Sequence, residues 1–134
     1  MEKITISVEG ISSATFISPK INNITNGIKA LKFVIKENLI DSADIQLVIN
    51  DTNEINVWTG KCDELLSLDI FSTAEKVFLI LFAGLSCTAE SFNNVLQAIH
   101  NKLPSNTLFL YSIINDDTVK TWNYVIFSQA SIIK

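Results

Sequence analysis

The sequence contains no arginine, and all ten of its basic residues are lysine. Arginine is the side chain best suited to bidentate recognition of phosphate and carboxylate, because its planar guanidinium presents several donors in a fixed geometry. Its absence, together with a net charge of −4, argues against a nucleic-acid-binding protein. It also argues against an enzyme that acts on an anionic metabolite.

Glycine is scarce as well. The four glycines are Gly10, Gly27, Gly60 and Gly84, and no two of them are close together in sequence. A phosphate-binding loop needs closely spaced glycines, because it must present several backbone N–H groups to one phosphate. The sequence therefore excludes GTP binding through a loop of this kind.

Few residues are suited to metal binding or nucleophilic catalysis. The chain has one histidine, His100, and two cysteines, Cys62 and Cys87, which lack CxxC spacing. No zinc-ligand pattern is present, and we expect both cysteines to be reduced, partly buried thiols. We accordingly predict no metal, no cofactor, no catalytic residue and no enzymatic activity.

Long hydrophobic runs are also missing. The longest, from Val77 to Leu85, is far below the ~18 residues that span a bilayer. Residues 1–8 alternate between polar and apolar side chains, whereas a signal peptide has a continuous apolar block. We expect no membrane segment and a cytoplasmic protein, and Met1 followed by a strand favours a natural start.

The 134 residues, of which 48% are hydrophobic, are sufficient for one domain with a buried core. Apolar periodicity predicts strands at 4–8, 55–60 and 76–82, and the last of these is apolar on both faces, as in a central strand covered on both sides. Helices are predicted at 20–38, at 41–50 with Ile45, Val48 and Ile49 facing the core, and at 88–103 with Thr88 as the cap. Residues 108–114 and 119–127 are predicted to form an antiparallel hairpin, 11–19 a loop with at most a short extended piece, and 63–71 a helical turn or two. This order predicts one α+β domain (1–134) with a mixed sheet and helices mainly on one face.

Acidic residues are concentrated between positions 41 and 75, where eight acids accompany one lysine, Lys61. This region is either a solvated, loop-rich segment or a surface that faces a cation, a water molecule or a basic partner. Within it, Asp41 can cap a helix, and Asp44 lies in the first turn, where an acid suits the helix dipole. These two acids are thus either structural caps or contact residues.

The element order resembles the C-terminal subdomain of the tubulin/FtsZ superfamily, with FtsZ the closer member. Residues 27–60 are similar to the end of FtsZ's long central helix, its synergy loop (T7 loop), the next helix and a strand that ends in glycine. Residues 77–127 are similar to its last three strands and the helix between the first two. The resemblance covers residues 21–128 and leaves 1–20 as an N-terminal strand and loop.

In FtsZ, the synergy loop enters the GTP pocket of the next subunit, and its aspartates help to orient the attacking water. Asp41 and Asp44 match these two aspartates in spacing, whereas Leu39 replaces the family's asparagine. The resemblance implies a module without GTPase activity that binds or modulates a tubulin-like cell-division or cytoskeletal GTPase. Asp41, Ser42 and Asp44 would form the partner interface.

Two other functions remain open. The same subdomain fold is similar to that of small trimeric proteins of the chorismate-mutase-like type, which bind ligands at subunit interfaces. Those enzymes hold carboxylates with arginine, which this chain lacks. The chain could instead be a structural assembly protein that forms homo-oligomers through an exposed strand edge.

Overall fold

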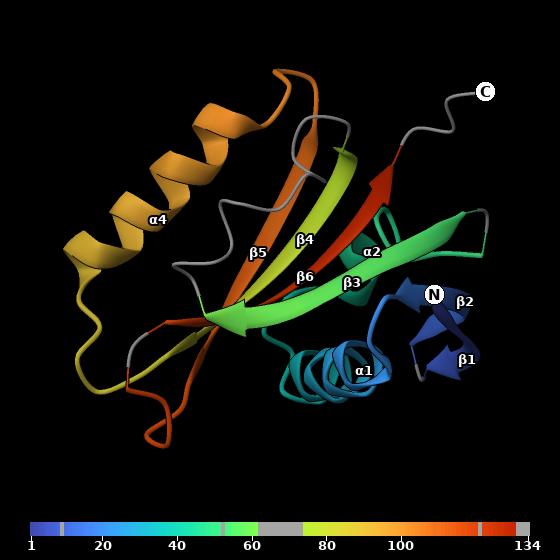
Figure 1. Ribbon diagram of the computed structural model, residues 1–134, viewed down its shortest axis with the longest axis horizontal. Coiled ribbons are helices and arrows are strands. Elements are labelled where there is room, and N and C mark those ends of the chain that lie inside the picture. Colours follow the sequence, from blue (N-terminus) through green and yellow to red (C-terminus); the bar gives the residue numbers. More distant parts are fainter. Residues whose placement is uncertain (9, 52, 62–73, 121, 131–134) are drawn as a thin grey trace.

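The computed structural model describes residues 1–8, 10–51, 53–61, 74–120 and 122–130. These residues form six strands and three helices, in the order β1 (Glu2–Val8), β2 (Ile11–Ser18), α1 (Ile21–Lys36), α2 (Ser42–Ile45), β3 (Glu54–Lys61), β4 (Ala74–Ala83), α4 (Ala89–Lys102), β5 (Leu108–Asn115) and β6 (Asn123–Ala130). The strands make one mixed sheet in the order β1-β2-β3-β6-β4-β5 (Figure 1). The predicted α+β fold with a single mixed sheet is confirmed.

The two faces of the sheet have separate hydrophobic cores. Phe78 and Phe127 belong to the core shared with α1 and with the residues around α2, whereas Leu79 and Ile126 face Ile99 of α4. Because successive residues of a strand point to opposite faces, β4 and β6 contribute to both cores. α1 and α2 thus lie on one face and α4 on the other. The prediction that 76–82 is a central strand covered on both sides is confirmed.

The predicted loop at 11–19 is wrong, because residues 11–18 form strand β2. It pairs antiparallel with β1 and parallel with β3. Ala14, Phe16 and Ser18 alternate along it and are buried. The serine and threonine content hid this alternation, because a hydroxyl side chain can be buried when it has a hydrogen-bond partner. Ser18 Oγ accepts from Asn23 Nδ2 of α1 at 2.9 Å.

The predicted hairpin between 108–114 and 119–127 is also wrong. β5 and β6 are not neighbours, because β4 lies between them, parallel to β5 and antiparallel to β6. The connection from β5 to β6 therefore crosses the end of β4, where Asp116 N donates to Ala83 O at 3.0 Å. Turn residues fix only the local change of direction. Strand pairing is decided by burial, and β4 is the strand with both faces apolar.

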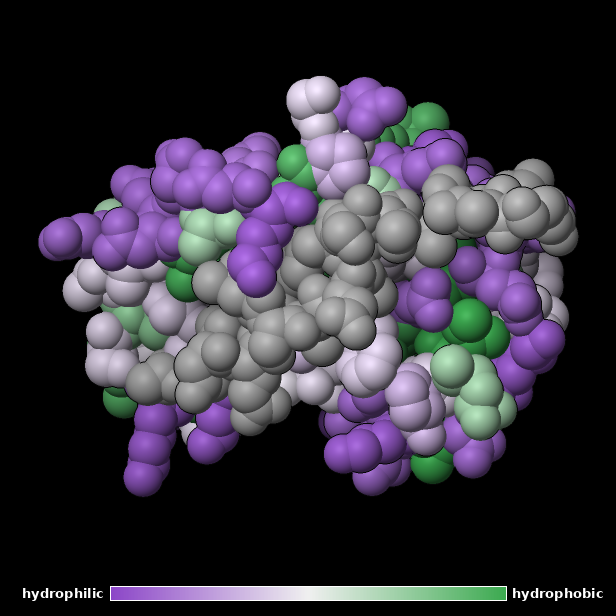
Figure 2. Space-filling view, turned by 45° about the horizontal axis from the view of Figure 1, so that its top comes forward, coloured by the Kyte–Doolittle hydropathy of each residue, from purple (hydrophilic) through white to green (hydrophobic). Residues whose placement is uncertain are grey.

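The second predicted helix is shorter than expected, since α2 ends at Ile45 rather than near Asn50. Val48 and Ile49 nevertheless face the core, as predicted, and are fully buried. The prediction of a helical turn at 63–71 and the residue Cys62 lie outside the described residues. On the face drawn in Figure 2, exposed hydrophobic side chains form small patches among hydrophilic ones. No helix in the described part of the chain is long and apolar enough to cross a membrane.

Candidate functional site

The junction between α1 and α2 carries the residues that the sequence singles out. α1 ends where Asn38 adopts a positive φ of 53°. Asn38 N then donates to Ile35 O and Leu39 N to Val34 O, at 3.2 and 3.1 Å, which together form a Schellman motif. Asparagine tolerates this left-handed conformation better than most side chains. The chain therefore leaves α1 in a fixed direction toward Asp41.

Asp41 is the N-cap of α2, as predicted. Its Oδ1 accepts a hydrogen bond from Ala43 N at 2.9 Å, and its backbone carbonyl accepts from Asp44 N and Ile45 N. The Asp44 side chain is exposed and makes no hydrogen bond or ion pair with another described residue. Both carboxylates are thus exposed to solvent, and that of Asp41 also caps α2. The two functions considered for Asp41, a cap and a contact residue, are compatible in this geometry.

Ser42 differs from the two acids because it is half-buried. It lies beneath the β1–β2 turn, where a Cβ placed on Gly10 would be 3.7 Å from Ser42 Cβ. Gln46 Nε2, at the C-terminal end of α2, also donates to Gly10 O at 2.8 Å, and this hydrogen bond links α2 to the β1–β2 turn. Of the three predicted interface residues, Asp41 and Asp44 are therefore the accessible ones.

The segment that follows α2 anchors this junction to the sheet. Ile45, Val48 and Ile49 are fully buried. Gln129 Nε2 of β6 donates to Val48 O at 2.6 Å, which satisfies a buried carbonyl. Asp41 and Asp44 are consequently held on a segment that is fixed at both ends.

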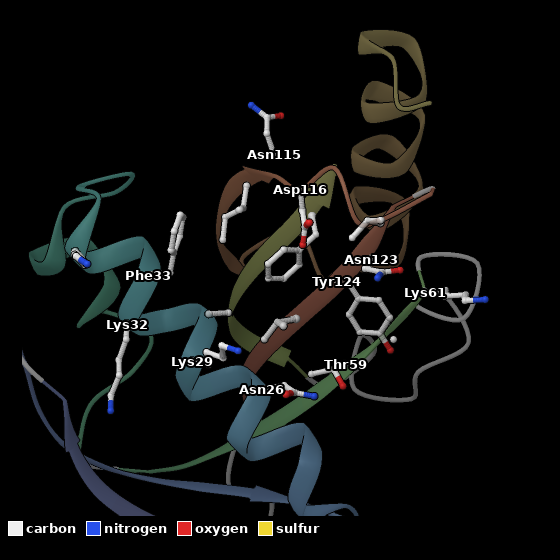
Figure 3. Close-up of a pocket in the computed structure, with 17 residues that line it drawn as sticks. Asn26, Lys29, Lys32, Phe33, Thr59, Lys61, Asn115, Asp116, Asn123 and Tyr124 are labelled. Carbon is white, nitrogen blue, oxygen red and sulfur yellow. The ribbon is translucent and has the colours of Figure 1, made fainter. Parts of the chain in front are cut away.

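A cleft of about 850 Å³ lies between α1 and one end of the sheet (Figure 3). Its apolar lining includes Phe33 of α1, Phe82 of β4 and Val125 of β6. Thr59 and Lys61 line it from β3, and Asp116 and Val119, which follow β5, also line it. Because the lining comes from five separate elements, no contiguous sequence motif could have indicated the cleft.

The charged side chains that line the cleft are mainly basic. Lys29, Lys32 and Lys36 line it from α1, and Lys61 from β3. In Figure 3, Lys32 points away from the sheet, while Lys29 lies beside the cleft. The spacing of three and four residues places the three α1 lysines on one side of the helix. Such spacing is equally typical of a solvated helix face, so the sequence alone does not indicate the cleft.

One acid, Asp116, also lines the cleft. Its carboxylate Oδ1 accepts from the Thr118 hydroxyl at 2.6 Å and from Thr118 N at 3.0 Å. These two hydrogen bonds, the hydroxyl first, lower the pKa of Asp116 below its ordinary value of 3.8. The group is therefore ionised at neutral pH, so the cleft combines four lysines with one carboxylate.

Elsewhere, the described residues offer little for catalysis. They contain no group of three or more histidine, cysteine or acidic side chains that could hold a metal ion. His100 is exposed and packs edge-on against Phe109, with ring centroids 5.1 Å apart. Trp122 is partly buried, packs against the α4 core and donates to Ser91 Oγ at 2.9 Å.

No protein-family model matches the chain, and no curated protein matches it by sequence. Its structure is similar to that of an FtsZ dimer from M. jannaschii, with a TM-score of 0.61 and 18% identity over 80% of this chain and 36% of that chain. It is also similar to CetZ from Methanosaeta thermophila, with a TM-score of 0.54 and 7% identity over 79% and 36% of the two chains.

A third similar structure is a protofilament of TubZ from Bacillus thuringiensis serovar israelensis, with a TM-score of 0.51 and 18% identity. This match covers 80% of the present chain and 35% of that chain. The chain thus has a tubulin/FtsZ-like C-terminal-domain fold and spans little more than a third of the length of these proteins. At these low sequence identities the structural similarity establishes the fold alone, and the activity has to be argued from the residues.

Proposed function

We propose that this chain is a partner domain for a tubulin-like GTPase, which it contacts through the exposed carboxylates of Asp41 and Asp44. The observation that carries the proposal is the position of the two acids. They lie at the α1–α2 junction, which resembles the FtsZ synergy loop in the spacing of its two aspartates, in a domain that folds like the FtsZ C-terminal domain. Such a domain could occupy one end of a filament in place of a complete subunit.

Rigid presentation of the two acids supports this function. The Schellman motif at Asn38 and the cap at Asp41 fix the segment before α2, and buried Val48 and Ile49 fix the segment after it. A preorganised surface loses less conformational entropy when a partner binds. The exposed acids also favour a partner surface with positive potential.

The proposal includes no nucleotide binding by the chain itself. Its four glycines are at least 17 positions apart in sequence, so a glycine-rich phosphate loop cannot form. The chain would therefore act on a partner that supplies the nucleotide, in the same compartment as that partner. Titration with a fluorescent GTP analogue is expected to show no saturable binding to the isolated chain.

Co-sedimentation with the FtsZ or tubulin-like GTPase of the source organism tests the proposal. We expect the chain to change the amount of sedimented polymer and the rate of GTP turnover in a dose-dependent manner, up to equimolar ratio. Unchanged polymer and unchanged turnover at equimolar ratio would overturn the proposed function.

Charge-neutral variants locate the contact. Asp41→Asn retains a capping side chain and Asp44→Asn is exposed, so both are expected to fold normally while they weaken the effect on the partner. Asp51→Asn removes an exposed acid outside the α1–α2 junction and is the matched control. If Asp51→Asn weakens the effect as much as the other two variants, general negative charge rather than this junction is responsible.

The cleft supports a second candidate function, which is binding of a small amphipathic anion. Its apolar walls suit a hydrocarbon or aromatic body, and its lysines suit a carboxylate, phosphate or sulfonate group. The fluorescent probe 8-anilinonaphthalene-1-sulfonate has this chemistry. Bright, saturable binding that Lys29→Gln and Lys61→Gln together weaken, and that Lys102→Gln outside the cleft does not, would support this function.

A further inference from the structure

The outer edge of β5 is a prominent surface that the proposed function does not use. β5 ends the sheet beside β4, and within the described ranges no strand pairs with its other side. Its eight residues, LFLYSIIN, include no charged residue and no proline. They pair with β4 without interruption, from Lys76↔Leu108 to Ala83↔Asn115. A regular, uncharged edge strand presents backbone N–H and C=O groups with which another strand can pair.

The opposite edge of the sheet, β1, is protected against such pairing. It carries Glu2 and Lys3, and Lys3 Nζ forms an ion pair with Glu54 Oε2 at 2.6 Å. Its pairing with β2 is also irregular between Ile6 and Val8. Charged side chains and bulges are two devices that discourage edge-to-edge association. The contrast singles out β5 as the edge open to pairing.

Aromatic side chains extend from the α4 core to this edge. Phe109 and Tyr111 of β5 lie 6.0 Å apart between ring centroids, and Phe92 of α4 lies 5.7 Å from Tyr111. Tyr111 is nevertheless 44% exposed, although it belongs to this ring cluster. A strand added at the edge would bury this ring further, and cross-strand aromatic pairs stabilise sheets.

The charges at the two ends of β5 are complementary. Lys76 of β4 lies beside the first residue of β5, and Lys102 is in the last turn of α4, which leads into β5. Asp116 and Asp117 directly follow the last residue of β5. Glu75 also lies at the first end, and Lys120 lies near the second. With these two residues included, the first end still has a net positive charge and the second a net negative charge. Antiparallel pairing of two β5 strands brings opposite charges together, whereas parallel pairing brings like charges together.

We propose that two copies of this chain associate through antiparallel pairing of their β5 strands. The two six-stranded sheets would then form one continuous sheet, related by a two-fold axis near Tyr111 and Ser112 at the middle of the strand. Each copy supplies the same neutral edge, so the contact closes as a dimer. It uses the end of the sheet opposite to β1 and β2, where the β1–β2 turn is fastened to α2 (Figure 1). The dimer is therefore independent of the proposed function.

Sedimentation equilibrium over a concentration series tests the dimer. We expect the wild-type chain to approach twice its monomer mass of 14.9 kDa as concentration rises. Tyr111→Lys places like charges opposite one another at the axis and should raise the dimer dissociation constant at least ~tenfold. Ser7→Lys adds the same charge at exposed Ser7 on β1 and should leave the constant unchanged. A monomer at every concentration, or equal weakening by both variants, would overturn the proposal.

Hydrogen–deuterium exchange of the wild-type chain provides a second test that does not depend on the folding of a variant. Part of the β5 amides point away from β4, and we expect these to exchange more slowly at high protein concentration than at low concentration. Amides of β1 should show no such dependence. Concentration-dependent protection confined to residues 37–46 would assign self-association to the α1–α2 junction and contradict pairing through β5.

Discussion

Gly27 of α1 lies directly against Val57 of β3, so that a Cβ placed on Gly27 would be 2.6 Å from Val57 Cγ1 and 3.4 Å from Phe127 Cε1. All three residues are buried. This contact sets how closely α1 can approach the sheet and, with it, the width of the cleft between them.

Gly27→Ala is expected to destabilise the chain despite the higher helix propensity of alanine. The clash with stiff, buried Val57 should lower the free energy of unfolding by about 1–3 kcal/mol. Replacing a glycine within a helix by alanine should raise it by about 1 kcal/mol or less. Urea denaturation should therefore show a net loss of about 1–2 kcal/mol. Asn26→Ala, at an exposed neighbouring position, is the control and should not lower stability. Equal stability of both variants would refute the close approach.

Gln129→Met tests the anchor of the segment after α2. The substitution preserves length but removes the donor to Val48 O, and an unsatisfied buried carbonyl costs about 1–3 kcal/mol. We expect faster hydrogen exchange around residues 46–50 together with reduced stability. Gln97→Met, on the exposed side of α4, should change neither measurement. Normal exchange at 46–50 in Gln129→Met would show that buried Val48 and Ile49 suffice as anchors.

Thr88→Ala tests the start of α4. Thr88 Oγ1 accepts from Ser91 N at 3.1 Å, and Ser91 Oγ accepts from Thr88 N at 3.0 Å, which forms a capping box. Loss of the cap should reduce the free energy of unfolding by about 1 kcal/mol. Thr88→Asp retains an N-cap acceptor and should restore most of the stability. If Thr88→Asp is as unstable as Thr88→Ala, the cap is not the cause.

Thr118→Val should raise the pKa of Asp116 toward its ordinary value of 3.8, because the hydrogen bond from the Thr118 hydroxyl contributes most to the lowering. A lowered pKa in the folded state stabilises the fold above the ordinary value, and this contribution is lost as pH falls through the folded pKa. The wild type should therefore lose it only in acid below 3.8. An NMR titration of the Asp116 carboxyl group in both proteins measures the shift, and identical curves would contradict the prediction.

Several elements were predictable because their signals are local. The apolar stripe of α1, the stop at Asn38, the cap at Asp41 and the cap at Thr88 depend on residues within a few positions of one another. Periodicity also indicated that 76–82 is buried on both faces, as β4 is. These features reflect helix and strand geometry, which nearby side chains largely decide.

Strand β2 was not predicted, because amino-acid composition does not show whether a polar side chain finds hydrogen-bond partners in the folded protein. Ser18 looked like a loop residue, yet Asn23 of α1 donates to its hydroxyl, and Thr59 of β3 donates to Asn23 Oδ1 at 2.8 Å. This chain of hydrogen bonds joins β2, α1 and β3. A buried serine is favourable only when such partners are present, and those partners are 5 and 41 positions away in sequence.

For the candidate site, sequence alone identified Asp41, Ser42 and Asp44 and their place at a helix start. It could not show that Ser42 is half-buried under the β1–β2 turn, because Gly10 and Gln46 are 36 positions apart. The cleft was likewise invisible, since Lys29, Lys61 and Asp116 belong to elements that only the folded sheet brings together.

The sequence by itself determined the class of the fold, the ends of the main helices and the absence of arginine and of a glycine-rich loop, because these depend on composition and on neighbouring residues. Only the tertiary structure decided that β6 lies between β3 and β4 and that β5 is left at the edge. Strand order depends on which apolar faces can be buried together across the whole chain, and that free energy has no local signature.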